Sequence, residues 1–241
     1  MLVNPPVKVS QEKIEFDVRE LEAILQGPAM DIPAYPPAYI TLKSGEKMLI
    51  RPAKYEEAPM LLSHLKKFLD VENDFYDFVG ARIYAEVLGW YRKRLKDPYT
   101  LLGLINGEWV GFCNGRLMNE DVNISLHSLA LRRGGRIGAI MYYAKCEYCF
   151  EILGQKEFWA TYESYNGFKR WGIGMAQPSY PWPDVQHELG GARVYYITKE
   201  YWNTTVKRYL QDLVGGALVR PVPEDVLKAN EALRIPEELY V

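Results

Sequence analysis

Residues that bind metal ions or form disulfides are scarce in this sequence. It contains three cysteines and three histidines among 241 residues. So sparse and odd a set of cysteines argues against a disulfide framework and fits a reducing compartment. Cys146 and Cys149 have the CxxC spacing, but they fall inside a predicted helix, and a second cysteine pair that would complete a tetrahedral site is missing. The sequence therefore predicts neither a bound metal nor a redox pair.

Long apolar runs and an excess of one charge are also missing. No stretch approaches about eighteen uninterrupted apolar residues, and residues 1–10 lack the apolar core of a signal peptide. Lysine and arginine total 29 against 31 aspartate and glutamate, for a formal net charge of -2. The chain thus has no global field that would hold nucleic acid or an anionic membrane. We expect a cytoplasmic protein whose partners include neither.

Apolar residues, by contrast, are plentiful enough for a substantial core, at 48% of the chain with 13% aromatic. Apolar spacing predicts a helix at 10–26, and dense prolines at 33, 36 and 37 predict an extended arm or linker after it. Helical patterns return at 200–215 and 223–233. We therefore expect an N-terminal helix and proline-rich arm at 1–46, a central domain at 47–200 and a C-terminal helical extension at 201–241.

The central domain alternates strand and helix patterns. Asn106-Gly107 is a preferred two-residue hairpin turn and separates two β-rich runs. Strands are predicted at 48–50, 99–105, 109–118, 122–131, 157–162 and 193–198, and helices at 55–69, 78–95, 137–152 and 166–171. A mixed order of this kind, with helices on the faces of a sheet, predicts an α/β fold.

The segment from Arg132 to Ala139 has the composition of a phosphate-binding loop. It joins a predicted strand to a predicted helix and has glycines at 134, 135 and 138. Glycines bring main-chain N–H groups close to an anion, and a helix start adds the positive end of its dipole. Three arginines near the positive end of the dipole are an unfavourable placement unless an anion binds there. Each guanidinium group can bind two phosphate oxygens at once. Pyrophosphate is the predicted ligand; the alternative is a tight turn with solvated arginines.

The wider segment from Leu126 to Glu151 resembles the fourth strand, the R/QxxGxG/A acyl-CoA loop and the third helix of the GNAT N-acetyltransferase superfamily. The order of elements before it, and the segment from Glu157 to Trp171 after it, resemble the rest of that domain over about residues 47–200. The resemblance implies a divergent member with a mixed, mostly antiparallel central sheet, flanked by helices and extended by helices at both ends. It also implies acetyl-CoA or another acyl-CoA as co-substrate.

The same resemblance implies where the co-substrate binds. The main chain at Leu129 and Leu131 would hold the pantetheine arm, and Asn166, at the start of the short helix, would contact CoA or only cap that helix. Arg136 stands where the motif has its middle glycine, which alters the main-chain cradle. The residues implied to hold the pyrophosphate are Arg132, Arg133, Gly134, Gly135, Arg136, Ile137, Gly138 and Ala139.

Catalysis in the family needs a base for the amine and a proton for the departing thiolate. His127 stands where the fourth strand often carries a carboxylate base, and an imidazole can accept the ammonium proton. The alternative is an ordinary strand histidine satisfied by its neighbours. Phe168 occupies the position of the usual tyrosine acid, so Tyr165 is the substitute, unless it is simply a surface tyrosine.

The connection from residue 70 to 77 is acidic and borders the acceptor groove in the resembled family. Asp70, Glu72 and Asp74 would concentrate a protonated amine there, or would only keep a solvated loop soluble. The leading hypothesis is an acyl-CoA-dependent N-acyltransferase that acts on a small-molecule or peptide amine by direct transfer in a ternary complex. The alternatives are an inactive GNAT-like acyl-CoA-binding or assembly module and an unrelated α/β interaction protein. A homodimer is compatible with each.

Overall fold

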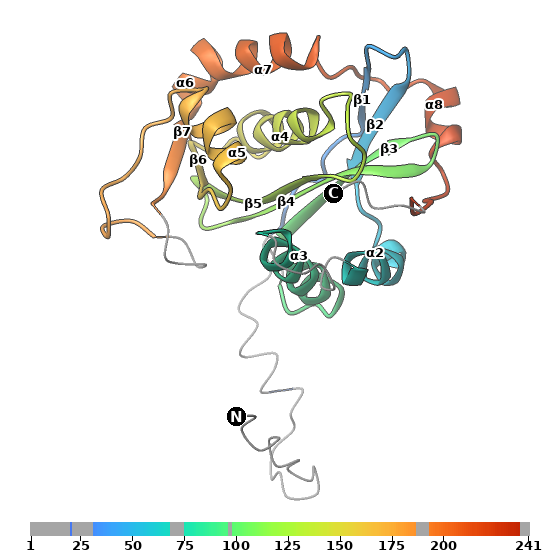
Figure 1. Ribbon diagram of the computed structural model, residues 1–241, viewed down its shortest axis with the longest axis horizontal. Helices are drawn as coiled ribbons and strands as arrows, with labels where there is room; N and C mark the ends of the chain where they lie inside the picture. Colours follow the sequence, from blue (N-terminus) through green and yellow to red (C-terminus); the bar gives the residue numbers. More distant parts are fainter. Residues whose placement is uncertain (1–19, 21–30, 68–74, 96–97, 187–192, 237–241) are drawn as a thin grey trace, which may run out of the picture.

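The computed structural model describes residue 20 and residues 31–67, 75–95, 98–186 and 193–236. Within these residues, seven strands form one sheet in the order in which they occur in the chain. Neighbouring strands are antiparallel except β5 and β6, which are parallel. Figure 1 shows the sheet at the centre of the molecule with helices on both sides. This confirms the predicted α/β fold with a mixed, mostly antiparallel sheet.

The strands lie close to the predicted positions, with one addition at the start. The predicted hairpin joins β3 and β4, and its two turn residues have positive φ angles of 50° at Asn106 and 84° at Gly107, as a type I′ turn requires. The strands are β1 (Ala38–Thr41), β2 (Lys47–Pro52), β3 (Pro98–Ile105), β4 (Glu108–Leu117), β5 (Val122–Ala130), β6 (Glu157–Ala160) and β7 (Tyr195–Thr198).

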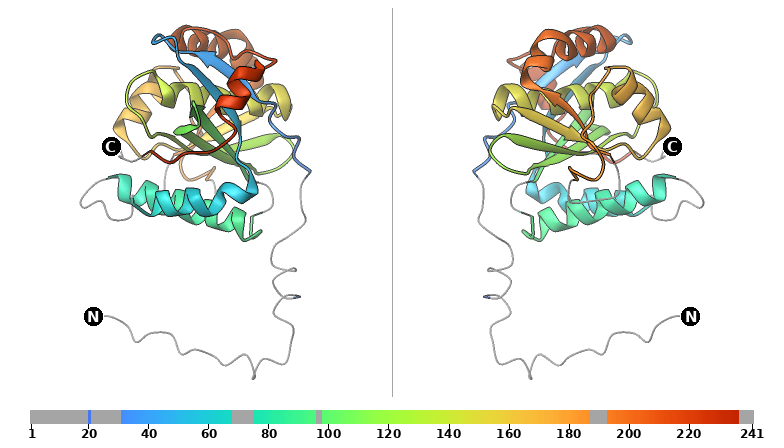
Figure 2. Two further views of the ribbon diagram at one scale, coloured as in Figure 1. Left: turned by 90° about the vertical axis from the view of Figure 1, so that its right-hand side faces the viewer. Right: turned by 90° about the vertical axis from the view of Figure 1, so that its left-hand side faces the viewer.

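The helices are divided between the two faces of the sheet. Helices α2 and α3 lie side by side on one face, and α4 and α5 lie on the other with α7 beyond α4 (Figures 1 and 2). Every helix in the described ranges is too short or too polar to cross a membrane. The helices are α2 (Ala58–Leu65), α3 (Phe75–Tyr91), α4 (Ile137–Glu147), α5 (Tyr165–Gly167), α6 (Lys199–Tyr201), α7 (Lys207–Val214) and α8 (Glu224–Ala229), with π-helical turns at Tyr148–Ile152, Phe168–Ile173 and Trp202–Val206.

Alternation along the strands separates two hydrophobic cores. Met48 and Ile50 belong to the core under α4, whereas Leu49 between them belongs to the core with α2 and α3. In the next strand, Leu101 and Leu102 divide in the same way. Successive side chains of a strand point to opposite faces, so a central strand covered by helices on both sides is apolar throughout.

The structure adds strand β1, which the sequence analysis placed in the arm. Ala38 and Ile40 are 0% and 3% exposed, and β1 pairs with β2 over its whole length. The two prolines just before it hide this strand in the sequence, yet they precede its first paired residue, Ala38, so they remove no hydrogen bond from its ladder with β2. Tyr39 also exchanges two main-chain hydrogen bonds with Val219 (3.1 and 2.8 Å). The division of the chain at residues 47 and 200 stays a prediction.

Helix α4 is buried on more than one side. The sheet covers one face, and α7 contacts the opposite face. Cys146 near the end of α4 and Cys149 in the turn after it are both 0% exposed. Burial raises the pKa of each thiol, so both stay protonated at neutral pH. A helix between a sheet and a second helix has no solvent-exposed face, so its sequence lacks the polar stripe of an amphipathic helix.

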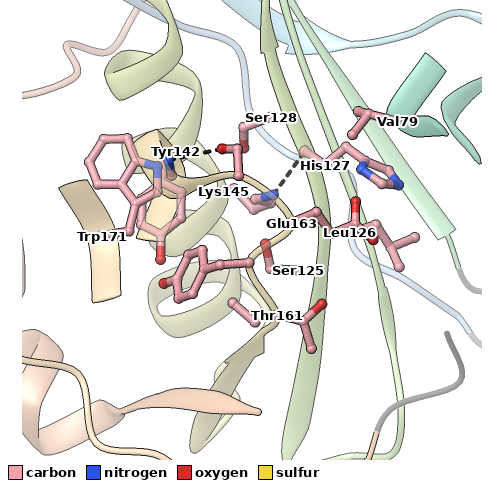
Figure 3. A pocket seen from close by; sticks show the side chains of 14 residues that line it. Val79, Ser125, Leu126, His127, Ser128, Tyr142, Lys145, Thr161, Glu163 and Trp171 are labelled. Carbon is pink, nitrogen blue, oxygen red and sulfur yellow. Dashed lines mark hydrogen bonds between the residues drawn. The ribbon is translucent and has the colours of Figure 1, made fainter. Parts of the chain in front are cut away.

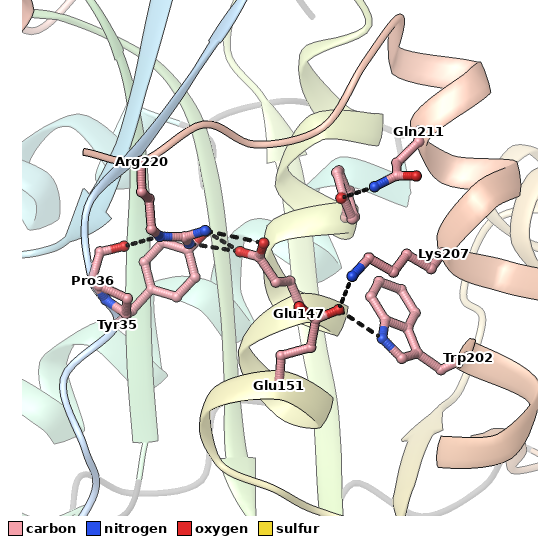
Figure 4. Close-up of polar contacts among 9 residues, drawn as sticks. Tyr35, Pro36, Glu147, Glu151, Trp202, Lys207, Gln211 and Arg220 are labelled. Atoms are coloured by element: carbon pink, nitrogen blue, oxygen red, sulfur yellow. Dashed lines mark hydrogen bonds and ion pairs between the residues drawn. The ribbon is translucent and has the colours of Figure 1, made fainter. Parts of the chain in front are cut away.

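Glu147 anchors segments from both ends of the chain on α4 (Figure 4). Its carboxylate accepts two hydrogen bonds from the Arg220 guanidinium (3.1 and 2.7 Å) and one from the Tyr35 hydroxyl (2.9 Å). Arg220 also donates from Nε to the carbonyl of Pro36 (3.2 Å). The Glu147 side chain is 7% exposed. A buried carboxylate needs such partners because desolvation otherwise penalises its charge.

We expect Arg220→Met to lower the free energy of unfolding by about 2–3 kcal/mol, because it leaves the Glu147 carboxylate buried without its cation. The loss stays below that of a fully buried pair because the Arg220 side chain is 28% exposed. Urea denaturation measures it. Lys228→Met, which breaks the exposed pair of Lys228 and Glu224, is the control and should cost about 0.5 kcal/mol or less. Equal losses would contradict the prediction.

Candidate active site

Strands β5 and β6 run parallel for four residues and then separate. Their pairing extends from Val122 opposite Glu157 to Ser125 opposite Ala160. The opening beyond this point holds a cavity of about 130 Å³. Side chains from β5, α3, α4 and the segment around α5 line it (Figure 3). The cavity therefore exists because the parallel strands β5 and β6 stop forming hydrogen bonds with each other at this point.

On its other edge, β5 loses regular pairing with β4 beside His127. The register shifts between Cys113 and Gly115, so that Asn114 faces two residues of β5. In this bulge the His127 N–H donates to the side-chain Oδ1 of Asn114 (2.9 Å). A bulge bends the strand and re-aims its side chains. This irregularity contributes to the divergence of β5 and directs His127 toward α3.

Helix α3 places a carboxylate against that histidine. Glu86 Oε1 lies 3.1 Å from His127 Nε2, and Asn114 Nδ2 donates to the other oxygen of Glu86. The Glu86 and His127 side chains are 13% and 5% exposed. When Glu86 accepts the Nε2–H, the neutral imidazole carries its free electron pair on Nδ1. The arrangement can then accept a proton at Nδ1 and stabilise the charged ring through Glu86.

Helix α4 places Lys145 in the same cavity wall from the opposite face of the sheet. Its Nζ donates to the main-chain carbonyls of His127 (2.8 Å) and Asn114 (3.4 Å). The residue is 1% exposed. Burial lowers the pKa of the Lys145 ammonium to about 8, against the smaller opposing effect of nearby thiols and Glu86. The charged and neutral forms of this amine are therefore both accessible at mildly alkaline pH.

The wall around α4 and α5 is aromatic. The rings of Tyr142 and Trp171 stack with centroids 4.4 Å apart. The Tyr162 hydroxyl donates to Oε1 of Gln177 (2.6 Å), and Nε2 of Gln177 donates to the Tyr142 hydroxyl (3.1 Å). Burial raises the pKa of Tyr142 and of Tyr162, so both phenols stay protonated at neutral pH.

The predicted phosphate loop lines a second cavity, of about 230 Å³. Three consecutive loop residues have positive φ angles, 84° at Gly134, 59° at Gly135 and 59° at Arg136. Glycine adopts this conformation freely, whereas arginine pays a steric penalty. Helix α4 starts directly after Arg136, and within the described residues no side chain caps its first N–H groups. The loop thus presents exposed arginines and the positive end of an 11-residue helix to the same cavity.

A carboxylate from the β1–β2 turn already contacts this loop. Arg132 donates to both oxygens of Glu46, from Nη1 at 3.1 Å and from Nη2 at 2.7 Å. This hydrogen bonding, together with the Ser44 hydroxyl, lowers the pKa of Glu46. Both side chains of the pair are about one-third exposed, at 34% and 32%. Glu46 therefore occupies the guanidinium fork that a phosphate would use.

We expect Glu46→Gln to raise the affinity for CoA by about 3–10-fold, or roughly 1 kcal/mol. The substitution removes a negative charge from the loop cavity and weakens the competition for Arg132. Isothermal titration calorimetry measures the change. Glu200→Gln, which removes the same charge on the exposed surface of α6, is the matched control and should leave the affinity unchanged. Weaker binding by Glu46→Gln would show that Glu46 orders the loop rather than competing with the ligand.

The structure brings some of the predicted site residues together and leaves others apart. His127 lines the cavity between β5 and β6, and Arg132, Arg133, Gly134, Gly135, Arg136 and Ile137 line the loop cavity. Tyr165 is 72% exposed and Asn166 is also exposed; neither belongs to the residues that line these two cavities.

The remaining predicted residues have different settings. Leu129 and Leu131 lie on β5 and just beyond it, and the Leu131 N–H already donates to the carbonyl of Val110 (2.9 Å). Gly138 and Ala139 lie in the first turn of α4. The predicted acceptor residues Asp70, Glu72 and Asp74 lie outside the described residues.

Sequence reasoning missed Glu86, Lys145 and Tyr162. Glu86 lies in a helix whose spacing looks like an ordinary amphipathic pattern, so nothing local marks it. Lys145 offered a signal, since it is the first charged residue after an uncharged run that begins at Ile137. Tyr162 ends the predicted strand at 157–162 and is one of 18 tyrosines in the chain.

Comparison with solved structures identifies the fold. The chain is similar to Mycobacterium smegmatis RimJ, solved in complex with CoA-disulfide, with a TM-score of 0.51 and 13% identity over 77% of this chain and 98% of that chain. It is also similar to a candidate acetyltransferase (TM-score 0.51, 16% identity, 80% of this chain and 100% of that chain). A third similar structure is an uncharacterized protein of Bacillus halodurans, with a TM-score of 0.51 and 11% identity over 75% of this chain and 99% of that chain.

Comparison of sequence alone finds no such likeness. No protein-family model matches the chain, and no curated protein matches it. The structural similarity at this low identity shows the fold, which is the GNAT fold that the resemblance implied.

Proposed function

We propose that this chain, which has the GNAT fold, transfers an acyl group from an acyl-CoA, acetyl-CoA in the first place, to an amine. The observation that carries this proposal is that one strand, β5, serves two sites. His127 on β5 lines the cavity between the diverging strands, and the chain then leads into the Arg132–Ala139 loop at the start of α4. The five steps from His127 to Arg132 span about 17 Å when extended, a length that the pantetheine arm of CoA covers.

The two ends of this path fit the two ends of an acyl-CoA. At the loop, arginine forks and the start of α4 supply the positive potential that a pyrophosphate requires. Asn166 and the main chain at Leu129 and Leu131 are proposed to guide the rest of the co-substrate. At the other end, the small cavity between β5 and β6 admits a short acyl group beside polar side chains. Metal ions have no part in the proposed reaction.

The proposed chemistry is direct transfer within a ternary complex. An incoming ammonium loses its proton to His127, which Glu86 orients and stabilises once it is charged. His127 passes this proton to solvent, and the neutral amine then attacks the thioester carbonyl. The bond from carbon to sulfur breaks as the amide forms, and His127 takes the second proton from the nitrogen. Tyr165 was the expected proton donor for the sulfur, but the tyrosines that line the cavity are Tyr142 and Tyr162.

The acceptor is proposed to be a cationic small-molecule or peptide amine. This rests on the acidic residues Asp70, Glu72 and Asp74, in the connection that leads into α3, the helix that carries Glu86. Charges of one sign near a cleft raise the local concentration of a counter-charged substrate, an effect that salt screens. A cytoplasmic location and a homodimer are part of the same proposal. A screen of cationic, neutral and anionic amines tests the acceptor class.

Thermal shift with CoA, acetyl-CoA and longer acyl-CoAs tests the function. A ligand present at 100 times its Kd stabilises the folded state by about 2.7 kcal/mol. Release of free thiol from acetyl-CoA in the presence of the amine panel then tests for transfer. Stabilisation without thiol release would favour the alternative of an inactive acyl-CoA-binding module, for which Arg136 and Phe168 are the motivating departures from the family pattern. A protein that shows no stabilisation and no thiol release would overturn both the transferase proposal and the binding-module alternative.

A further inference from the structure

Lys145 is a buried cation that the proposed reaction leaves without a role. It reaches from α4 to the strand pair that carries His127, and it lines the cavity in which the thioester is proposed to react (Figure 3). A lysine that is 1% exposed incurs a large desolvation cost. Because burying the Lys145 amine costs stability, a function that needs an amine in this cavity would explain why a lysine is found here.

The geometry of Nζ leaves one bond direction for a ligand. The ammonium group has three N–H donors, and the carbonyls of His127 and Asn114 take two of them at 2.8 and 3.4 Å. The ring of Tyr142 lies 5.9 Å from Nζ and borders the same cavity. The third N–H can therefore be used within the cavity that Lys145 lines.

The tyrosines near the cavity are less suited to supply a proton there. Phe168, at the position where the resembled family has its tyrosine acid, has no proton to donate. Tyr165 is 72% exposed and does not line the cavity. Tyr162 lines the cavity, but its hydroxyl already donates to Gln177 at 2.6 Å. Its raised pKa also makes it a weaker acid than a thiol, whose usual pKa is about 8.5. Efficient proton transfer needs a donor whose pKa lies near that of the acceptor.

We propose that Lys145 is the general acid of the acyl transfer and protonates the sulfur of the departing CoA. This inference rests on the proposed function. The acceptor nitrogen bonds to the acyl carbon, the bond from that carbon to sulfur breaks, and its electron pair remains on sulfur. A protonated amine first passes one proton through His127 to solvent, so that His127 is neutral again when the amine attacks. After the attack the acceptor nitrogen gives its second proton to His127, and sulfur takes one proton from Nζ. Neutral Lys145 keeps its two carbonyl hydrogen bonds and regains a proton from solvent after CoA leaves.

The charge of Lys145 responds to groups on each element around it. Cys113 on β4, Cys146 on its own helix and Glu86 on α3 all favour the ammonium form, and His127 on β5 contacts it through the main-chain carbonyl. Burial has the larger, opposite effect and lowers the pKa to about 8. Lys145 is therefore protonated below about pH 8 and loses its transferable proton above it.

Hydroxylamine is the probe that isolates this step, because it is already neutral at pH 7 and needs no base to deprotonate it before it attacks. With acetyl-CoA and hydroxylamine, we expect Lys145→Met to lower kcat for thiol release by about 10²-fold while the KM for acetyl-CoA changes little. The wild type should lose kcat as pH rises through about 8, and the variant should lack this alkaline limb. Lys207→Met, which breaks the pair of Lys207 with Glu151 in the π-helical turn after α4, is the control and should match the wild type.

The outcomes separate this inference from the proposed function. A wild type that neither binds acetyl-CoA nor releases thiol overturns both. A wild type that turns over without an alkaline limb overturns the role of Lys145, and this measurement needs no variant, so it holds even if Lys145→Met fails to fold. A folded variant with unchanged kcat overturns it as well. A variant that loses kcat but keeps the wild-type pH profile identifies Lys145 as a support for the strand rather than an acid.

Discussion

Replacing His127 by alanine, or Glu86 by glutamine, is expected to lower kcat for acylation of a protonated amine by about 10²–10⁴-fold with little change in affinity for acetyl-CoA. The ammonium of the acceptor must lose a proton before its nitrogen can attack. His127 is placed to take that proton, and Glu86, 3.1 Å from Nε2, fixes the ring and stabilises its charged form. Steady-state kinetics with the best amine from the screen measures kcat, and calorimetry measures affinity.

The control for this pair of variants is Glu151→Gln. Glu151 is also a partly buried carboxylate with a cationic partner, Lys207 at 2.7 Å, but it faces α7 away from the cavity (Figure 4). It should keep full kcat. If His127→Ala and Glu86→Gln lose thermal stability while kcat per folded molecule is unchanged, His127 is an ordinary strand histidine satisfied by Glu86 and Asn114, as the other sequence-based interpretation holds.

Charge reversal in the loop is expected to abolish measurable CoA binding. Arg133→Glu and Arg136→Glu each replace an exposed guanidinium by a carboxylate at the start of α4, so attraction for a pyrophosphate becomes repulsion. We expect a loss of at least about 100-fold per variant, or roughly 2.7 kcal/mol. The loss should shrink as salt rises, because screening at about 8–10 Å weakens exposed charges. Calorimetry with acetyl-CoA at two salt concentrations measures both effects.

Arg208→Glu is the matched control for charge reversal. The Arg208 side chain is 88% exposed on α7 and pairs locally with Asp212, so its reversal should leave CoA affinity unchanged. Circular dichroism should show an intact fold in all three variants. Wild-type affinity in both loop variants would mean that the arginines are solvated and that the loop is simply a tight connection between β5 and α4.

Much of the fold is predictable from the sequence because it depends on local patterns. The hairpin at Asn106-Gly107 depends on two adjacent residues that adopt positive φ, and its strands follow from β-rich runs on either side. The loop at Arg132–Ala139 depends on the spacing of its glycines and arginines between a strand and a helix. In each case the physical cause acts over a few residues, so the printed sequence contains it.

The candidate site is less predictable because its residues meet across the fold. His127 was expected from the position that the family resemblance gave it on a strand. Glu86 lies 41 residues away and reaches it because α3 packs against the face of the sheet toward which the bulge at Asn114 turns the ring. Lys145 reaches His127 from the opposite face. Strand β1 was missed for a similar reason, since its pairing with β2 overrides the breaking effect of the prolines before it.

By itself, the sequence determined the order of the elements, the α/β class, and a loop whose cations and glycines suit an anion at the start of a helix. The tertiary structure alone decided that β5 and β6 separate after Ser125 and Ala160, and that Glu86, His127 and Lys145 meet beside the opening. The reason is physical. Periodicity and turn chemistry act between neighbours in the chain, whereas strand divergence, bulge position and helix packing are set by side chains that lie far apart in sequence and come together only when the sheet is complete.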